Sequence, residues 1–120
     1  LSNNVLNNYL TQYKHCKNVT YIYNPIAVDT IESTPLTQKL AIAFGRLSRQ
    51  KGFDMLVEAW ALIEKEVPDW KLDIYGQGPL QKELQGQIDG LGLRNIERKG
   101  FSDDIHKEYM ESSLLLLSSR

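Results

Sequence analysis

One stretch of the chain decides the fold: residues 39–53 read KLAIAFGRLSRQKGF. Its apolar part, residues 39–44, stops at Gly45, which is typical of a strand buried on both faces of a parallel sheet. The turn that follows carries three cations, which are Arg46, Arg49 and Lys51. They stand at the predicted start of a helix, where backbone amides already favour negative charge. We therefore expect any ligand bound there to be anionic, and a phosphorylated molecule is the natural candidate.

Helix and strand patterns alternate downstream of this stretch. Apolar residues from Phe53 to Val67 recur at helical spacing, and Pro68-Asp69 closes that helix. Further strands are predicted at residues 71–75, 95–99 and 114–117, and the last of these is expected to be buried. A second helix is predicted from Pro79 to Leu91. A third is predicted around Ile105 and Tyr109, with residues 102–104 as its cap. This alternation indicates the α/β class, with a Rossmann-like doubly wound parallel sheet and helices on both faces.

The part of the chain before residue 39 is predicted to stand apart from this sheet. A helix of about a dozen residues follows the capping residues 2–4, and a β-branched and aromatic strand spans residues 19–23. Residues 1–23 are therefore assigned to a segment that precedes or joins the main domain. Residues 24–38 are assigned to a linker or long surface loop, and residues 39–120 to a partial Rossmann-like domain.

Composition and charge narrow the classes of function. The 120 residues are 42% hydrophobic and 24% charged, which suits one core of ordinary size. Fourteen basic and fifteen acidic residues leave a formal net charge of -1, so bulk charge does not favour nucleic acid as a partner. The single Cys16 excludes an internal disulfide framework, and no run approaches the roughly 20 apolar residues that cross a bilayer. These features predict a cytoplasmic protein.

Three predicted loops meet at the carboxyl edge of the sheet, where ligands of such folds bind. The loops span residues 45–52, 76–79 and 100–104. In the first loop Lys51 precedes Gly52 instead of following a glycine, and no Ser or Thr comes next, which disfavours a Walker-type NTPase. In the second loop Gln81 occupies the third glycine position of the dinucleotide-binding fingerprint, which disfavours NAD as a ligand. Simpler interpretations stay open, namely solvated cations in the first loop and a tight connection at residues 76–78.

Side chains that often mark other functions are assigned to structure. Trp60 lies on the apolar face of its predicted helix, and Trp70 is expected to anchor the second strand of the sheet. His15 and His106 lack partners at metal-ligand spacing, and no Ser, His and Asp arrangement can be picked out. The sequence therefore predicts no metal site.

Four motifs occur in order along the chain: Phe44-Gly45-Arg46-Leu47-x-x-x-Lys51-Gly52, Ile74-Tyr75-Gly76-x-Gly78-Pro79-Leu80, Gly100-Phe101, and residues 114–119. Together they resemble the group 1, or family 4, glycosyltransferases of the GT-B fold. The resemblance covers residues 21–120, and Tyr23-Asn24-Pro25-Ile26 is similar to the junction between the two domains of that family.

The resemblance implies a retaining enzyme that transfers a sugar from a nucleoside-diphosphate sugar to a glycan, lipid or other acceptor. Arg46 and Lys51 match the basic pair that grips the donor diphosphate, and Gly45 matches a glycine that lets the backbone come close. Cations held there stabilise the leaving diphosphate as the glycosidic bond breaks. The resemblance thus implies neither a cofactor nor an obligatory metal.

The other two loops are matched to the nucleotide. Gly76 and Gly78 match the glycine loop of the family beside the nucleotide. Phe101 and Ser102 fall near the segment whose backbone reads the base. The nucleotide sugar is thus the expected small-molecule partner.

Two departures from the family pattern predict a fragment. The family carries two glutamates separated by seven residues just past the position of Ser119, and it has an amino-terminal acceptor domain, which this chain lacks. We expect the 120 residues to be inactive alone and to belong to a longer parent that associates peripherally with the membrane. Residues 114–117 are expected to expose apolar surface, so the fragment should tend to self-associate.

Two alternative interpretations belong to other classes of protein. A non-catalytic α/β module that binds a nucleotide or a partner would need a complete sheet. A receiver-like signalling domain would need an acidic pocket at the strand ends, where this chain carries Arg46 and Lys51.

Overall fold

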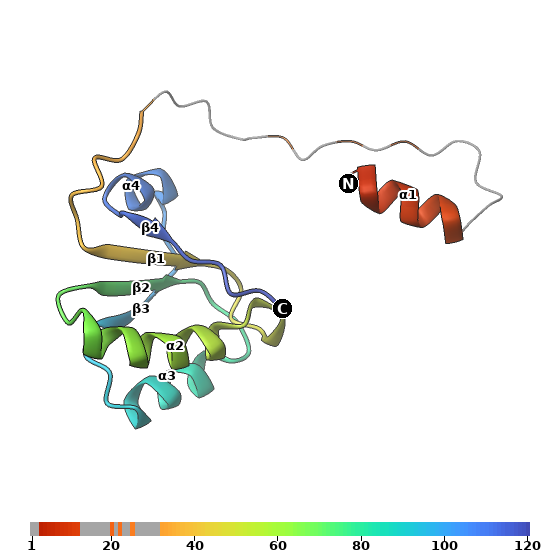
Figure 1. Cartoon of the computed structure of the whole chain (residues 1–120). Helices are drawn as coiled ribbons and strands as arrows, with labels where there is room; N and C mark the ends of the chain where they lie inside the picture. Colours follow the sequence, from red (N-terminus) through yellow and green to blue (C-terminus); the bar gives the residue numbers. More distant parts are fainter. Residues whose placement is uncertain (1–2, 13–19, 21, 23–24, 26–31) are drawn as a thin grey trace. The chain divides into compact units, whose positions relative to one another are not determined.

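The computed structural model describes residues 3–12, 20, 22, 25 and 32–120 (Figure 1). The chain divides into two compact units, Leu1–Glu32 and Ser33–Arg120. The first unit contains helix α1 (Asn3–Gln12), which confirms the predicted N-terminal helix. Residues 19, 21 and 23 of the predicted strand, and seven of the fifteen residues of the predicted linker, lie outside the described residues, so the predicted domain bounds stay a prediction. The two described residues of the predicted strand, 20 and 22, do not belong to a strand.

The second unit is built on a four-stranded parallel sheet with the order β3-β2-β1-β4 (Figure 1). Its strands are β1 (Leu40–Phe44), β2 (Lys71–Tyr75), β3 (Ile96–Gly100) and β4 (Leu114–Leu115). The connecting helices are α2 (Phe53–Glu66), α3 (Gln81–Gly90) and α4 (Ile105–Met110). The predicted α/β class with a parallel sheet is confirmed.

The strand order explains why helices cover both faces of the sheet. From β1 through β2 to β3 the chain moves in one direction, and α2 and α3 lie on the same face (Figure 1). From β3 the chain returns past two strands to β4 and carries α4 on the opposite face. Parallel crossovers are almost always right-handed, so a reversal of direction moves the helix to the other face. The carboxyl ends of the strands near this reversal are where doubly wound sheets bind ligands.

The face covered by α2 and α3 holds the main core. Two in-register pairs of fully buried residues lie on it, which are Ala41 with Leu72 and Ala43 with Ile74. The small alanine side chains of β1 leave room for the large residues of α2, among them Trp60. Trp60 is buried in the core cluster and Trp70 packs against it, which confirms their predicted structural roles.

Aromatic side chains attach α4 to the opposite face. Phe44, at the end of β1, stacks on Tyr75 with 4.8 Å between the ring centroids. The ring of Tyr109 in α4 lies 5.3 Å from Phe44 in a tilted arrangement. Aromatic pairs of this geometry add to the burial of apolar area. They hold α4 beside the carboxyl ends of β1 and β2.

Helix α3 begins two residues later than predicted. Pro79 is not its first residue, because α3 starts at Gln81. The amide of Leu80 donates to the carbonyl oxygen of Leu47 at 3.0 Å instead. The amide of Leu84 donates to the carbonyl oxygen of Leu80 at 2.9 Å, which makes Leu80 the capping residue that precedes α3.

Two helices also end earlier than their apolar patterns predicted. Helix α2 stops at Glu66 and is capped by Val67, and α3 stops at Gly90 and is capped by Leu91. Both capping side chains are exposed rather than buried.

Across the described residues, no helix combines the length and apolar content needed to cross a membrane.

The prediction of a buried strand over residues 114–117 is wrong. Only Leu114–Leu115 forms β4, and both side chains are about half exposed. Within the described residues β4 pairs only with β1, so one of its edges and much of its side-chain surface meet solvent. The expected exposure of apolar surface is confirmed, whereas self-association stays a prediction.

A leucine in the core can be compared with a leucine at the surface. We expect Leu72→Ala to lower the free energy of unfolding by about 2–5 kcal/mol, because it leaves a cavity under α2. The matched control Leu62→Ala removes a side chain that is 68% exposed, and it should change the free energy by less than about 0.5 kcal/mol. Urea denaturation followed by circular dichroism measures both values, and equal effects would contradict this assignment of the core.

Candidate functional site

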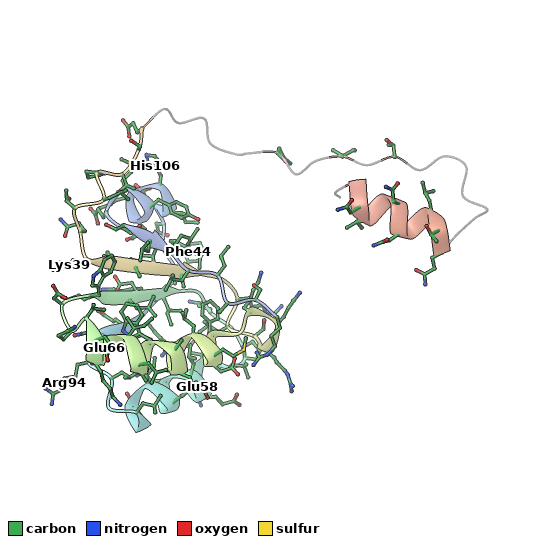
Figure 2. All side chains as sticks on the ribbon, in the orientation of Figure 1. Lys39, Phe44, Glu58, Glu66, Arg94 and His106 are labelled. Carbon is green, nitrogen blue, oxygen red and sulfur yellow. The ribbon has the colours of Figure 1, made fainter. Side chains whose placement is uncertain are left out.

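The loops that follow β1 and β2 run side by side beyond the carboxyl edge of the sheet. Phe44 marks the start of this region in Figure 2. The amide of Gly45 donates to the carbonyl oxygen of Tyr75 at 3.1 Å, and the amide of Leu47 donates to that of Gln77 at 2.9 Å. The pairing of the two strands thus continues into their loops.

Two of the predicted site glycines lie where these loops touch. A Cβ on Gly76 would stand 1.8 Å from the carbonyl oxygen of Gly45, and the φ of Gly76 is +145°, which side chains rarely permit. A Cβ on Gly78 would stand 2.4 Å from the carbonyl oxygen of Leu47. The motif Gly76-x-Gly78 therefore allows two backbones to pack together. Its expected role beside a nucleotide stays a prediction.

A cavity of about 300 Å³ opens where the three strand-end loops meet. Five of the seven predicted site residues line it, which are Gly45, Arg46, Gly76, Phe101 and Ser102. The other two, Lys51 and Gly78, do not line it. Lys51 nevertheless lies close, because its Cγ is 3.5 Å from the position that a Cβ on Gly45 would take. The structure thus gathers most of the predicted residues at one edge of the sheet.

The three cations of the first loop have no partner in the described part of the chain. No hydrogen bond or ion pair engages the side chains of Arg46, Arg49 or Lys51 there. The short 3-10 turn η1 (Arg49–Lys51) is followed directly by α2, whose amino end adds positive potential. An anion at this loop would therefore meet positive charge that no carboxylate neutralises.

One carboxylate joins the second strand to the third loop along the cavity. Glu108 of α4 accepts a hydrogen bond from the Tyr75 hydroxyl at 2.6 Å and another from the Ser102 hydroxyl at 3.2 Å. Burial, together with Glu108, raises the pKa of Tyr75 well above its ordinary value. Phe101 is left 75% exposed at the rim. Sequence reasoning missed Glu108 because its partner Tyr75 lies 33 residues away.

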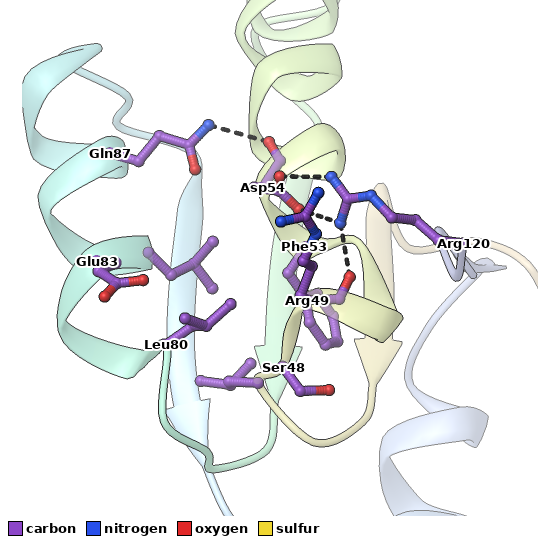
Figure 3. Close-up of a pocket in the computed structure, with 10 residues that line it drawn as sticks. Ser48, Arg49, Phe53, Asp54, Leu80, Glu83, Gln87 and Arg120 are labelled. Atoms are coloured by element: carbon purple, nitrogen blue, oxygen red, sulfur yellow. Dashed lines mark hydrogen bonds and ion pairs between the residues drawn. The ribbon is translucent and has the colours of Figure 1, made fainter.

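A larger cavity of about 460 Å³ lies between the amino ends of α2 and α3 (Figure 3). None of the seven predicted site residues lines it. Its polar rim includes the ion pair between Asp54 and Arg120, whose closest atoms are 2.7 Å apart. Neither residue was singled out from the sequence, because 66 positions separate them.

Comparison with known proteins identifies the family. The sequence profile of the family described as "Glycosyl transferases group 1" matches residues 29–120. The chain belongs to this family. The predicted resemblance is confirmed, and the parallel sheet with helices on both faces matches GT-B glycosyltransferases.

Two curated relatives illustrate the range of similarity. The poly(glycerol-phosphate) alpha-glucosyltransferase of Bacillus subtilis is 27% identical over 106 residues, which is 83% of this chain and 16% of that protein. The amylovoran biosynthesis glycosyltransferase AmsD of Erwinia amylovora is 31% identical over 122 residues, which is 94% of this chain and 34% of that protein. The chain therefore spans between 16% and 34% of the length of these two glycosyltransferases.

Solved structures of other glycosyltransferases share the fold. A mutant of S. aureus TarM superposes with a TM-score of 0.86 at 24% identity. The match covers 100% of this chain and 24% of TarM. HepE of Anabaena superposes with a TM-score of 0.60 at 28% identity and covers 68% of this chain and 23% of HepE. Both matches agree with the sheet described above.

Two glycines test the backbone contact between the loops. We expect Gly76→Ala to lower the free energy of unfolding by at least about 1–3 kcal/mol, because the new methyl group meets the backbone of Gly45 in a strained conformation. The matched control Gly86→Ala lies within α3 with nothing within 4 Å of the new Cβ, so it should raise stability by about 0.5–1 kcal/mol. Thermal and urea unfolding measure both, and a neutral Gly76→Ala would contradict the contact.

The Tyr75 hydroxyl gives a prediction for alkaline pH. We expect Tyr75→Phe to lower the free energy of unfolding by about 0.5–1.5 kcal/mol at neutral pH, because it removes a partly buried hydrogen bond to Glu108. Because the pKa of Tyr75 is higher in the folded than in the unfolded chain, its neutral hydroxyl stabilises the fold fully at pH values below the unfolded pKa of about 10. This contribution is lost as the pH rises from there toward the folded pKa. Urea denaturation from about pH 8 to 11 should therefore show the difference between the two proteins shrinking. A difference that does not change with pH would contradict this account.

Proposed function

We propose that this chain forms the donor-binding part of a glycosyltransferase whose donor is a nucleoside-diphosphate sugar. The observation that carries the proposal is a cavity at the carboxyl ends of parallel strands that Arg46 lines and that Lys51 adjoins beside Gly45, both cations being unpaired among the described residues. A diphosphate carries negative charge in a compact group, and cationic side chains are its usual partners. Membership of the group 1 glycosyl transferases supports sugar transfer as the chemistry.

A solved relative supports a nucleotide sugar as the donor class. The structure of HepE is described as a complex with UDP and glucose. Its sequence is 28% identical to this chain over the shared region. A nucleotide and a sugar bound to that relative are the two parts of the donor proposed for this chain.

Each side of the smaller cavity receives a part of the proposed donor. Arg46 lines the cavity and Lys51 lies beside Gly45, so both are assigned to the diphosphate. Phe101 and Ser102 line the cavity on the side of the third loop and are assigned to the nucleoside. The exposed ring of Phe101 offers a flat apolar surface to a base.

Charge neutralisation is the proposed chemical role of the basic pair. When the bond between the anomeric carbon and the diphosphate oxygen breaks, the electron pair stays on that oxygen. The acceptor hydroxyl forms the new bond to the anomeric carbon and passes its proton to the departing diphosphate oxygen. Because the diphosphate becomes more negative during this step, Arg46 and Lys51 stabilise the transition state more than the bound donor. Two cations can do this without a metal ion or a cofactor.

The proposal extends to a longer enzyme, because the chain covers 34% or less of the curated relatives described above. In that enzyme an additional amino-terminal domain binds the acceptor, and the sugar keeps its anomeric configuration. The enzyme is proposed to be cytoplasmic and to work at the membrane surface. The 120 residues alone then bind the donor without transferring its sugar.

Titration of nucleotides tests the diphosphate site. We expect the chain to bind at least one of UDP, GDP and ADP about tenfold or more tightly than the matching nucleoside. Arg46→Ala and Lys51→Ala should each remove most of that preference, because charge-assisted hydrogen bonds to phosphate contribute about 1.5–3 kcal/mol. Isothermal titration calorimetry measures the affinities.

The control for this experiment is Arg94→Ala. Arg94 lies in the connection before β3, and its exposed side chain is far from the strand-end loops (Figure 2). This variant should keep the full preference for the diphosphate. Equal affinity of the unsubstituted chain for all nucleosides and diphosphates would overturn the proposed function.

A further inference from the structure

The turn that presents the cations is held from outside by the segment 118–120. The Ser118 hydroxyl donates to the carbonyl oxygen of Lys51 at 2.8 Å. The amide of Arg120 donates to the carbonyl oxygen of Gln50 at 2.8 Å, and its Nη1 donates to that of Arg49 at 2.6 Å. Three successive carbonyl groups of η1 are thus bound by one short segment.

The guanidinium of Arg120 also forms a two-point ion pair with Asp54 in the first turn of α2 (Figure 3). The distances are 3.0 Å from Nη1 to Oδ1 and 2.7 Å from Nη2 to Oδ2. The hydrogen bond to Arg120 holds the pKa of the Asp54 carboxyl below its ordinary value. A planar fork of this kind fixes orientation as well as distance. It connects the turn, the start of α2 and the segment 118–120 to one another.

A glycine gives the segment room to approach. Gly52 has a φ of +62°, and a Cβ on it would stand 2.1 Å from the carbonyl oxygen of Ser118. The amide of Gly52 donates to the carbonyl oxygen of Arg49 at 3.1 Å, which closes the turn. The geometry of η1 therefore depends on packing against Ser118 as well as on its own hydrogen bonds.

These contacts occupy the carbonyl oxygens of the turn. Carbonyl oxygens carry partial negative charge and would oppose a phosphate if they faced it. Those of Arg49, Gln50 and Lys51 are instead bound to the segment 118–120. The side chains of Arg49 and Lys51, on the same turn, have no partner in the described residues. Lys51 lies beside Gly45 at the smaller cavity, whereas Arg49 lines the larger one.

We infer that Ser118, Arg120 and Asp54 form a clamp that positions the basic turn 49–51 for the donor diphosphate. This inference rests on the proposed function. The three clamp residues are positioning residues, since they act on the diphosphate through the turn. The side chains of Asp54 and Arg120 are 49% and 36% exposed, and exposed ion pairs add little to global stability. Loss of the clamp should therefore disturb binding more than folding.

The experiment compares the affinity for UDP, GDP and ADP with that for the matching nucleosides in clamp variants of the 120-residue chain. We expect Arg120→Ala to weaken diphosphate binding by about tenfold while nucleoside binding stays unchanged. Arg120→Lys should recover part of the loss, because an ammonium can reach one carbonyl oxygen but cannot form the fork. Thermal unfolding should shift by less than about 5 °C in each variant.

Asp54→Asn separates positioning from direct contact. If Arg120 acted by touching the phosphate itself, removal of the neighbouring negative charge would strengthen diphosphate binding. The clamp predicts the opposite, namely weaker diphosphate binding, because the fork to Arg120 is lost. The matched control Lys39→Ala breaks another exposed ion pair, with Asp69 at the amino end of the sheet, and should change neither affinity.

The outcomes distinguish the two claims. A diphosphate preference that survives Arg120→Ala, or that increases in Asp54→Asn, overturns the clamp and leaves the proposed function standing. A preference that is absent already in the unsubstituted chain overturns the proposed function, and the clamp with it. A preference that falls in both variants while nucleoside binding is kept supports the clamp.

Discussion

The loop after β1 and the loop after β2 lie backbone against backbone, and the arrangement of the candidate site depends on this contact. Parallel strands in register send both loops in the same direction, so the loops must share the space beyond the sheet. They fit because Gly76 and Gly78 bring no side chain to the carbonyl oxygens of Gly45 and Leu47. Leu47 is buried in the core and anchors the first loop. The smaller cavity opens beside this contact, lined by residues of both loops.

The cations at this edge are not neutralised within the described part of the chain, because neighbouring carboxylates form hydrogen bonds or ion pairs with other groups. Asp54 is paired with Arg120, and Glu108 accepts hydrogen bonds from Tyr75 and Ser102. Asp104 accepts a hydrogen bond from a backbone amide of α4 and so caps that helix. These acidic groups stabilise helix ends and loops. The cations of the first loop therefore keep their charge available for a ligand.

Local patterns predicted the strands and helices where short-range chemistry is decisive. The apolar run before Gly45 is β1, the helical spacing around Trp60 is α2, and Asp104 caps α4 as expected. The errors occur where a distant contact intervenes. Leu80 caps α3 from outside the helix, and its amide donates to the carbonyl oxygen of Leu47 in the β1–α2 connection. Residues 114–117 are apolar enough for a buried strand, yet burial depends on what covers them, and β4 has a single neighbouring strand among the described residues.

By itself the sequence determined the parallel α/β fold, the family and the loops at which a ligand would meet the chain, because periodicity and turn residues act over a few positions. It also singled out Arg46, which does line a cavity. Only the tertiary structure decided that Gly76 serves a backbone contact and that Glu108 and Arg120 belong to the surroundings of the site. The physical reason is that each of these roles depends on a partner at least 31 positions away, such as Gly45 for Gly76. Such partners are brought together only when the crossovers place the strand ends side by side.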